Sequence, residues 1–176
     1  IRSLEAVGNV VFLSESRPDA VLTSSAQIKG NLLRFVNVTE RIQVEGPGTL
    51  VFMDQRPADK ASPVQRAAFR GTGKTLFQWQ GGLTWDAHHN DMLIHDAVRM
   101  THLPAGDDEL LMLDCQQLLA DLEATGGMTA WMGQDMPQPN VRSVKADHNV
   151  VIINGHRKIT TDHMLYTHAD RLVSLE

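Results

Sequence analysis

One stretch of the chain returns near its other end with the same residues at the same offsets. Ala6–Phe12 and Ala146–Ile152 share an alanine, an asparagine and two consecutive valines. A segment rich in small polar residues follows each copy, Leu22–Ser25 in the first case and Ile159–Asp162 in the last. A short repeated unit of this kind cannot bury its apolar face alone, and it gains stability by stacking on its neighbours. The repeat therefore predicts a stack of similar elements.

Alternation of apolar and polar residues runs through most of the chain. It is clear from Val10 to Phe12 and from Leu50 to Phe52, and glycine-rich turns such as Gly46–Gly48 separate the alternating runs. A period of two with turn residues between the runs predicts β-strands. The alternation is lost at 55–66 and 133–140, where proline and polar residues accumulate, and both stretches are expected to be surface loops.

The segment 107–124 fits two structures. Its apolar residues Leu111, Cys115, Leu118 and Leu122 have helical spacing, with acidic residues before them and Gly126–Gly127 after them. These are good start and stop signals for a helix. The same residues also read as two alternating strands, so the local sequence leaves helix and strand open.

The composition is that of one domain without covalent staples. A chain of 176 residues can bury a substantial core, so one domain over 1–176 is expected. The 21 acidic residues outnumber the 16 basic ones, which argues against a nucleic-acid partner. Cys115 is the single cysteine and forms no internal disulfide, which leaves the compartment open. The first residue is Ile1, so the chain is expected to be a fragment of a longer protein with any targeting or anchoring segment outside it.

Four short motifs recur within the repeat units. They are Gly8–Phe12, Ile42–Gly46, Leu83–Asp86, and Ile159–Asp162 followed by Tyr166. Together they resemble the OstA-like repeat of lipopolysaccharide-transport proteins. Serine or threonine pairs stand where that repeat usually has Ala-Asp, at Ser24–Ser25 and Thr160–Thr161.

The resemblance implies an all-β fold, an open antiparallel β-jellyroll in which residues 110–123 are strands. It also implies a non-catalytic function, the binding and transfer of lipopolysaccharide or a similar amphipathic glycolipid through an apolar interior groove. Such a domain would work in the periplasm or envelope of a Gram-negative-type bacterium, in outer-membrane biogenesis. Its partners would be other β-jellyroll envelope proteins or a second copy, joined by edge strands near Val7–Leu13 and Leu172–Leu175.

The candidate groove residues are the larger apolar side chains at alternating positions. An apolar residue on a strand is more often plain core, and methionine suits both uses because it is flexible. The candidates are Val10, Phe12, Ile42, Val44, Phe52, Phe77, Trp79, Trp85, Met92, Ile94, Met100, Val150, Ile152, Met164 and Tyr166.

No motif predicts catalysis, a cofactor or a metal. Gly71–Thr75 resembles part of a phosphate-binding loop, but Ala68 stands where the first glycine of that motif belongs. The histidines at 88, 89, 95 and 102 match no closed zinc set; His88 and His89 would face opposite sides of a strand, and exposed positions on the polar face are expected for the group.

Two further possibilities concern nucleophiles and sugars. Cys115 lies in an apolar stretch where a thiol is usually inert, and no serine lies in a Gly-x-Ser-x-Gly elbow. The alternative to lipid transfer is a structural or carbohydrate-binding β-sandwich, in which Trp79, Trp85 and Trp131 could stack on sugar.

Overall fold

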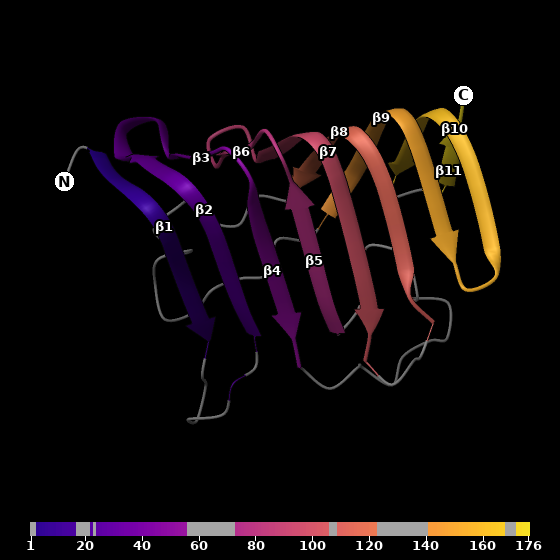
Figure 1. Cartoon of the computed structure of the whole chain (residues 1–176), viewed down its shortest axis with the longest axis horizontal. Coiled ribbons are helices and arrows are strands. Elements are labelled where there is room, and N and C mark those ends of the chain that lie inside the picture. Colours follow the sequence, from indigo (N-terminus) through magenta and orange to yellow (C-terminus); the bar gives the residue numbers. More distant parts are fainter. Residues whose placement is uncertain are drawn as a thin grey trace.

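The computed structural model describes residues 3–16, 22, 24–55, 73–105, 109–122, 141–167 and 172–176. Eleven strands within these ranges form one antiparallel sheet (Figure 1). A single 3₁₀ turn, Asn37–Thr39, interrupts them, and no helix in these ranges has the length and hydropathy to span a bilayer. The strands are β1 Ser3–Ser16, β2 Ser24–Val36, β3 Arg41–Glu45, β4 Gly48–Asp54, β5 Gly73–Trp79, β6 Gly82–Asp86, β7 Asp91–Pro104, β8 Leu111–Leu122, β9 Val141–Asn154, β10 Arg157–Thr167 and β11 Leu172–Leu175.

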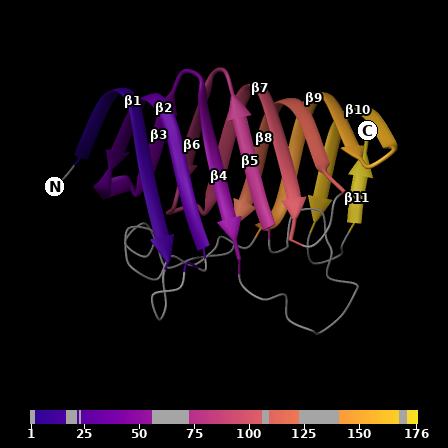
Figure 2. The same ribbon diagram turned by 60° about the horizontal axis from the view of Figure 1, so that its bottom comes forward.

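The sheet is folded along its length into two facing halves, which join at the top of Figure 2. Between β2 and β7 the pairing divides. One path runs β2–β4–β5–β7 and the other runs β2–β3–β6–β7, so the two ends of β2 and of β7 belong to different halves. We call these the β4–β5 half and the β3–β6 half. β1, β8, β9 and most of β10 extend the folded sheet on either side, which places the termini at opposite ends of the stack (Figure 1).

Left-handed backbone marks the fold line. Pairs of residues with positive φ lie at Gly8–Asn9 in β1, Asp96–Ala97 in β7 and His148–Asn149 in β9. The register shifts at the same places in β1 and β7. Glycine and asparagine adopt positive φ at low cost, which accounts for their place in these bends. Asn9 and Asn149, the asparagines shared by the two sequence repeats, therefore occupy equivalent bends.

Cross-strand register aligns the inward side chains into continuous rows, because residues directly opposite each other share a face of the sheet. Three rows consist only of apolar or aromatic residues. In the β3–β6 half, row 1 is Leu4, Phe35, Ile42, Trp85, Met92, Ala120, Val144, Tyr166 and Val173, and row 2 is Ala6, Leu33, Val44, Leu83, Ile94, Leu118, Ala146, Met164 and Leu175. In the β4–β5 half, row 3 is Phe12, Ile28, Leu50, Phe77, Met100, Leu113, Ile152 and Ile159.

The expected fold class is confirmed: the protein is all-β, with a folded antiparallel sheet of the jellyroll kind. The segment 111–122 is the strand β8, so the strand interpretation of this stretch is correct and the helical one is wrong. The two predicted loops, 55–66 and 133–140, lie outside the described residues apart from Gln55.

Candidate functional site

The fifteen candidate groove residues lie together in the interior of the folded sheet. Eleven are buried members of one hydrophobic core, with exposed fractions of 0–8%. The other four, Val10, Phe12, Phe52 and Ile152, are partly buried and pack against that core. The structure thus brings all of them into one apolar interior, from strands that lie far apart in the sequence.

Sequence analysis missed several members of the same rows. Leu83 and Ala146 are buried in row 2, next to the candidates Ile94 and Met164 respectively. Leu113 and Leu118 are buried members of the rows from β8. Strict alternation would have identified Leu83. The β8 residues were missed because their segment also fitted a helix.

The apolar rows reach both ends of the stack, and the last members of row 1 are exposed at both ends, those of rows 2 and 3 only on β11 and β10. Row 1 ends at Leu4 on β1 and Val173 on β11, which are 49% and 47% exposed. Row 3 ends at Ile159 on β10, which is 43% exposed. No other part of the described chain packs on these exposed residues. Each end of the stack therefore offers an apolar surface that is continuous with the core.

β1 is an unprotected edge strand. It pairs with β2 along its whole length and has no second neighbour among the described strands. From Ala6 to Ser14 it carries no charge, and its outward residues Val7, Val11 and Leu13 are more than half exposed. Edge strands of monomeric proteins are usually shortened, charged or covered, so this strand has the character of a pairing surface.

The other end of the stack is only partly covered. β11 pairs with Met164–Thr167 of β10, and the backbone of Glu176 bonds to Asp162 and His163. The remaining segment of β10, Arg157–Thr161, pairs with β9 on one side alone within the described strands. This edge begins with two cations, Arg157 and Lys158, whereas β1 carries two carboxylates, Glu5 and Glu15.

A polar strip lies just beyond row 3, along the margin of the β4–β5 half that lies away from the fold line. Here Thr75 pairs with His102 across β5 and β7, and its hydroxyl lies 2.8 Å from Nδ1 of the imidazole. His102 is only 7% exposed, and burial lowers its pKa from the ordinary value. The expectation of exposed histidines is therefore wrong for His102. Its side chain follows Val98 and Met100 into the interior.

The expected exposure is confirmed for His88 and His89, but the element that carries them is not a strand. His88 and His89 lie in the turn between β6 and β7 rather than on a strand, and their rings make an edge contact with centroids 5.2 Å apart. Asp86 holds this turn, because its Oδ1 accepts hydrogen bonds from the backbone amides of both residues. Burial would raise the pKa of Asp86, but hydrogen bonds from Arg41 and His89 outweigh it and hold the pKa well below its usual range. Asp86 therefore has a structural role.

The described residues include no group of three or more histidine, cysteine, aspartate or glutamate side chains arranged to hold a metal. Burial, with the nearby Asp114 carboxylate, raises the pKa of the Cys115 thiol to about 12. A thiol with this pKa is protonated at neutral pH and unreactive as a nucleophile. Gly73–Thr75 begins strand β5, so the phosphate-loop motif lacks the helix that would hold a phosphate.

The tryptophans also belong to the interior. Trp79 and Trp85 are 1% and 3% exposed, and Trp131 lies outside the described residues. The indole of Trp79 lies over Gly48 and donates a hydrogen bond from Nε1 to the carbonyl of Gly46. Neither of the two described tryptophans is available to stack on an external sugar.

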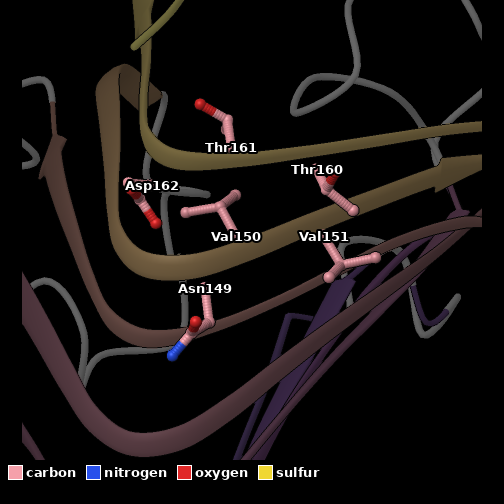
Figure 3. Close-up of a pocket in the computed structure, with 6 residues that line it drawn as sticks. All are labelled: Asn149, Val150, Val151, Thr160, Thr161 and Asp162. Atoms are coloured by element: carbon pink, nitrogen blue, oxygen red, sulfur yellow. The ribbon is translucent and has the colours of Figure 1, made fainter.

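A shallow depression of about 360 Å³ lies at the bend of β9 and β10 (Figure 3). The hydroxyl of Thr161 is already bonded to the carbonyls of His163 and Glu176. The depression lies at the fold line and shows no convergence of charged groups. Its lining residues are Asn149, Val150, Val151, Thr160, Thr161 and Asp162.

Compared with known proteins, the chain matches no protein-family model and no curated protein sequence. The features of the chain that bear on its function are therefore its folded sheet, its apolar rows and its two edges.

Proposed function

We propose that this domain binds and passes the acyl part of lipopolysaccharide, or of a similar amphipathic glycolipid, along its apolar interior. It does so without catalysis, as one segment of a transport bridge in the periplasm of a Gram-negative-type cell. The observation that carries the proposal is the continuity of rows 1, 2 and 3 across the folded sheet, with row 1 exposed at both of its ends and rows 2 and 3 exposed at their ends on β11 and β10.

An acyl chain gains free energy in such an interior. Each buried methylene contributes about 0.8 kcal/mol, so a partly inserted chain of several carbons is held firmly. Transfer requires that no step along the path meets a polar barrier, because an unpaired polar group in an apolar path is costly to pass. Rows 1, 2 and 3 contain no charged side chain.

The folded sheet supplies a way for a ligand to enter. Among the described strands, pairing joins neighbours within each half, and the halves meet at the bends and through side chains. Among the described residues, separation of the outer margins of the two halves therefore breaks side-chain packing and leaves the ladders of backbone hydrogen bonds intact. A ligand that fills the space with apolar groups replaces the lost packing.

A matched pair of variants on β9 tests the lipid site. Ile152→Asp places a carboxylate in row 3, whereas Ile153→Asp makes the same change on the outward face of the same strand. Native mass spectrometry of the protein with lipid A is expected to show stoichiometric adducts for the wild type and for Ile153→Asp, and none for Ile152→Asp. Circular dichroism checks that each variant is folded. A folded wild type without adducts would refute lipid binding.

The bridge itself depends on edge pairing between domains. The β1 edge of one copy and the exposed edge of β10 and β11 on another present the same apolar rows, and Glu15 and Arg157 carry opposite charges. We expect concentration-dependent association in sedimentation velocity. It should weaken in Val11→Glu, because a carboxylate on an edge strand blocks pairing. Equal association of the two proteins would contradict edge pairing through β1.

One observation favours the second candidate, a structural β-sandwich. Eleven of the fifteen candidate residues are already buried by their own neighbours, as in a filled core. In that case the edges assemble the domain into a larger structure and no lipid enters. The mass-spectrometry experiment separates the two functions, since a structural domain gives no adduct while it still associates through its edges.

A further inference from the structure

The polar groups of the interior are gathered at one margin. Buried polar residues in the described chain are Ser14, Ser24, Asp86 and His102, and all except Asp86 lie along the margin of the β4–β5 half that lies away from the fold line. Register places Ser14, on β1, in the same inward row as Thr75 and His102. This row, the polar strip, lies directly outside row 3. On β1, β5 and β7 the interior of this half thus changes from apolar to hydrogen-bonding over one step along the strand, whereas Ala26, Phe52 and Leu111 keep the row apolar on β2, β4 and β8.

The opposite margin has a different character. Row 1, on the β3–β6 half, has no aliphatic hydroxyl, amide or charged group, and its only polar side-chain atoms are the indole nitrogen of Trp85 and the hydroxyl of Tyr166. A ligand between the halves therefore meets a cluster of aliphatic hydroxyl and imidazole groups on the β4–β5 half and only these two aromatic polar groups in row 1. This difference fixes the orientation of an amphipathic molecule, with its apolar chain against the rows and its head at the polar strip.

The strip is almost uncharged. Ser14, Thr75 and Asn154 are neutral side chains, and the one described cation in the row is Arg157, at its far end on β10. A phosphate head would require several cations or amides at its oxygens. A hydroxylated head needs donors and acceptors alone, and serine, threonine and imidazole supply both.

We propose that Thr75 and His102 form the head-group contact of the interior site, and that they select a neutral, hydroxyl-bearing head such as a sugar. The inference rests on the proposed lipid function. Thr75 bonds to Nδ1 of His102 and so fixes the ring, which leaves Nε2 as the second polar atom of the imidazole. The Phe52 and Phe77 rings, in edge contact with centroids 6.3 Å apart, provide the apolar floor beside this pair.

Three ligands with the same ten-carbon chain separate the head from the tail. They are n-decyl glucoside, decyl phosphate and 1-decanol, each titrated into the protein by calorimetry. The wild type is expected to bind the glucoside more tightly than the other two. In Thr75→Val and in His102→Gln, glucoside affinity should fall by about two- to tenfold, as expected for loss of one net hydrogen bond, with decanol affinity unchanged.

Thr101→Val is the matched control. Thr101 neighbours His102 on β7 but faces outward, opposite Leu76, so removal of its hydroxyl should leave all three affinities unchanged. Equal losses for glucoside and decanol in Thr75→Val would overturn the head-group contact, as would tighter wild-type binding of decyl phosphate. If a folded wild type binds none of the three ligands, the lipid function itself fails. Binding of decanol without any preference for glucoside overturns this inference alone.

Discussion

Gly48 tests whether the interior is packed as tightly as the structure shows. A Cβ added there would lie 2.5 Å from Cζ2 of Trp79 and 2.6 Å from the carbonyl oxygen of Lys29. Ordinary contact begins at 3.4 Å, so both neighbours would have to move. The Lys29 oxygen belongs to the backbone of β2, and the indole is 1% exposed and bonded through Nε1 to the Gly46 carbonyl at 3.0 Å. Neither can move freely.

Gly48→Ala should therefore destabilise the protein by about 1–3 kcal/mol, the usual cost of overpacking a core. Urea unfolding followed by far-UV circular dichroism measures this free energy, with an unchanged m-value as evidence that the unfolded state is the same. In a Trp79→Phe background the ring atoms that the new methyl group meets are absent. Part of the cost should then be recovered, with a coupling free energy of about 0.5–3 kcal/mol.

Gly8→Ala is the control for this experiment. Gly8 has φ of 81° and no heavy atom within 4 Å of an added Cβ. Its substitution costs about 1–2 kcal/mol through backbone strain alone, and that cost should be the same with tryptophan or phenylalanine at 79. If the cost of Gly48→Ala is also independent of residue 79, the described packing of the indole on Gly48 is wrong.

Three further predictions concern pH, the thiol and the bends. Burial lowers the pKa of His102, so as the pH falls the unfolded state takes up a proton before the folded state does. The free energy of unfolding should therefore be constant above about pH 6.5 and fall below it by at most about 1.4 kcal/mol per pH unit. Urea titrations at pH 5 to 7 should show a smaller slope for His102→Gln. Identical slopes would exclude His102 as the source. Cys115, with its pKa raised to about 12 by burial and by Asp114, should react with Ellman's reagent at pH 8 only as urea unfolds the protein, and immediate reaction of the native protein would contradict its burial. Asn149 has φ of 54°, so Asn149→Val should cost about 1–2 kcal/mol in unfolding experiments and Asn149→Gly far less, whereas equal costs would show that the bend does not require left-handed backbone.

Alternation and the repeat were sufficient to predict most of the strands and most of the interior, but not β8, whose local sequence also fits a helix. Val44, Trp79 and Ile94 could be placed because each lies in a run with a clear period of two. The fold line could not be predicted, because it depends on which strands pair at each end of β2 and β7. Such pairings are long-range, and short sequence patterns contain little information about them.

Single polar residues were the other source of error. His102 is two residues after Met100 and four after Val98, so alternation along β7 places its side chain on the same inward face as theirs. The general preference of histidine for the surface was given more weight than that alternation. His88 and His89 were expected on a strand but lie in a turn. The carboxylate of Asp86 stabilises this turn through hydrogen bonds from the backbone amides of both residues, and the alternation of apolar residues gives no sign of such a contact.

The ambiguity at 107–124 has a definite physical cause. In β1, β7 and β9 two residues form the bend. The inward positions on either side of it are four residues apart, as Ala6 and Val10 are in β1 and Ile94 and Val98 are in β7, so even spacing is kept across the bend. β8 differs, because its inward residues Cys115 and Leu118 are three residues apart at the fold line, where the register shifts. Between the paired positions at the fold line, β8 has one residue, Gln116, where β7 has two, Asp96 and Ala97, so the inward positions are three apart in β8 and four apart in β7. Leu111, Cys115, Leu118 and Leu122 are thus separated by four, three and four residues, which is the spacing of a helix face. A strand that crosses a fold line with one residue fewer than its neighbours imitates a helix in sequence, and only those neighbours in the sheet distinguish the two.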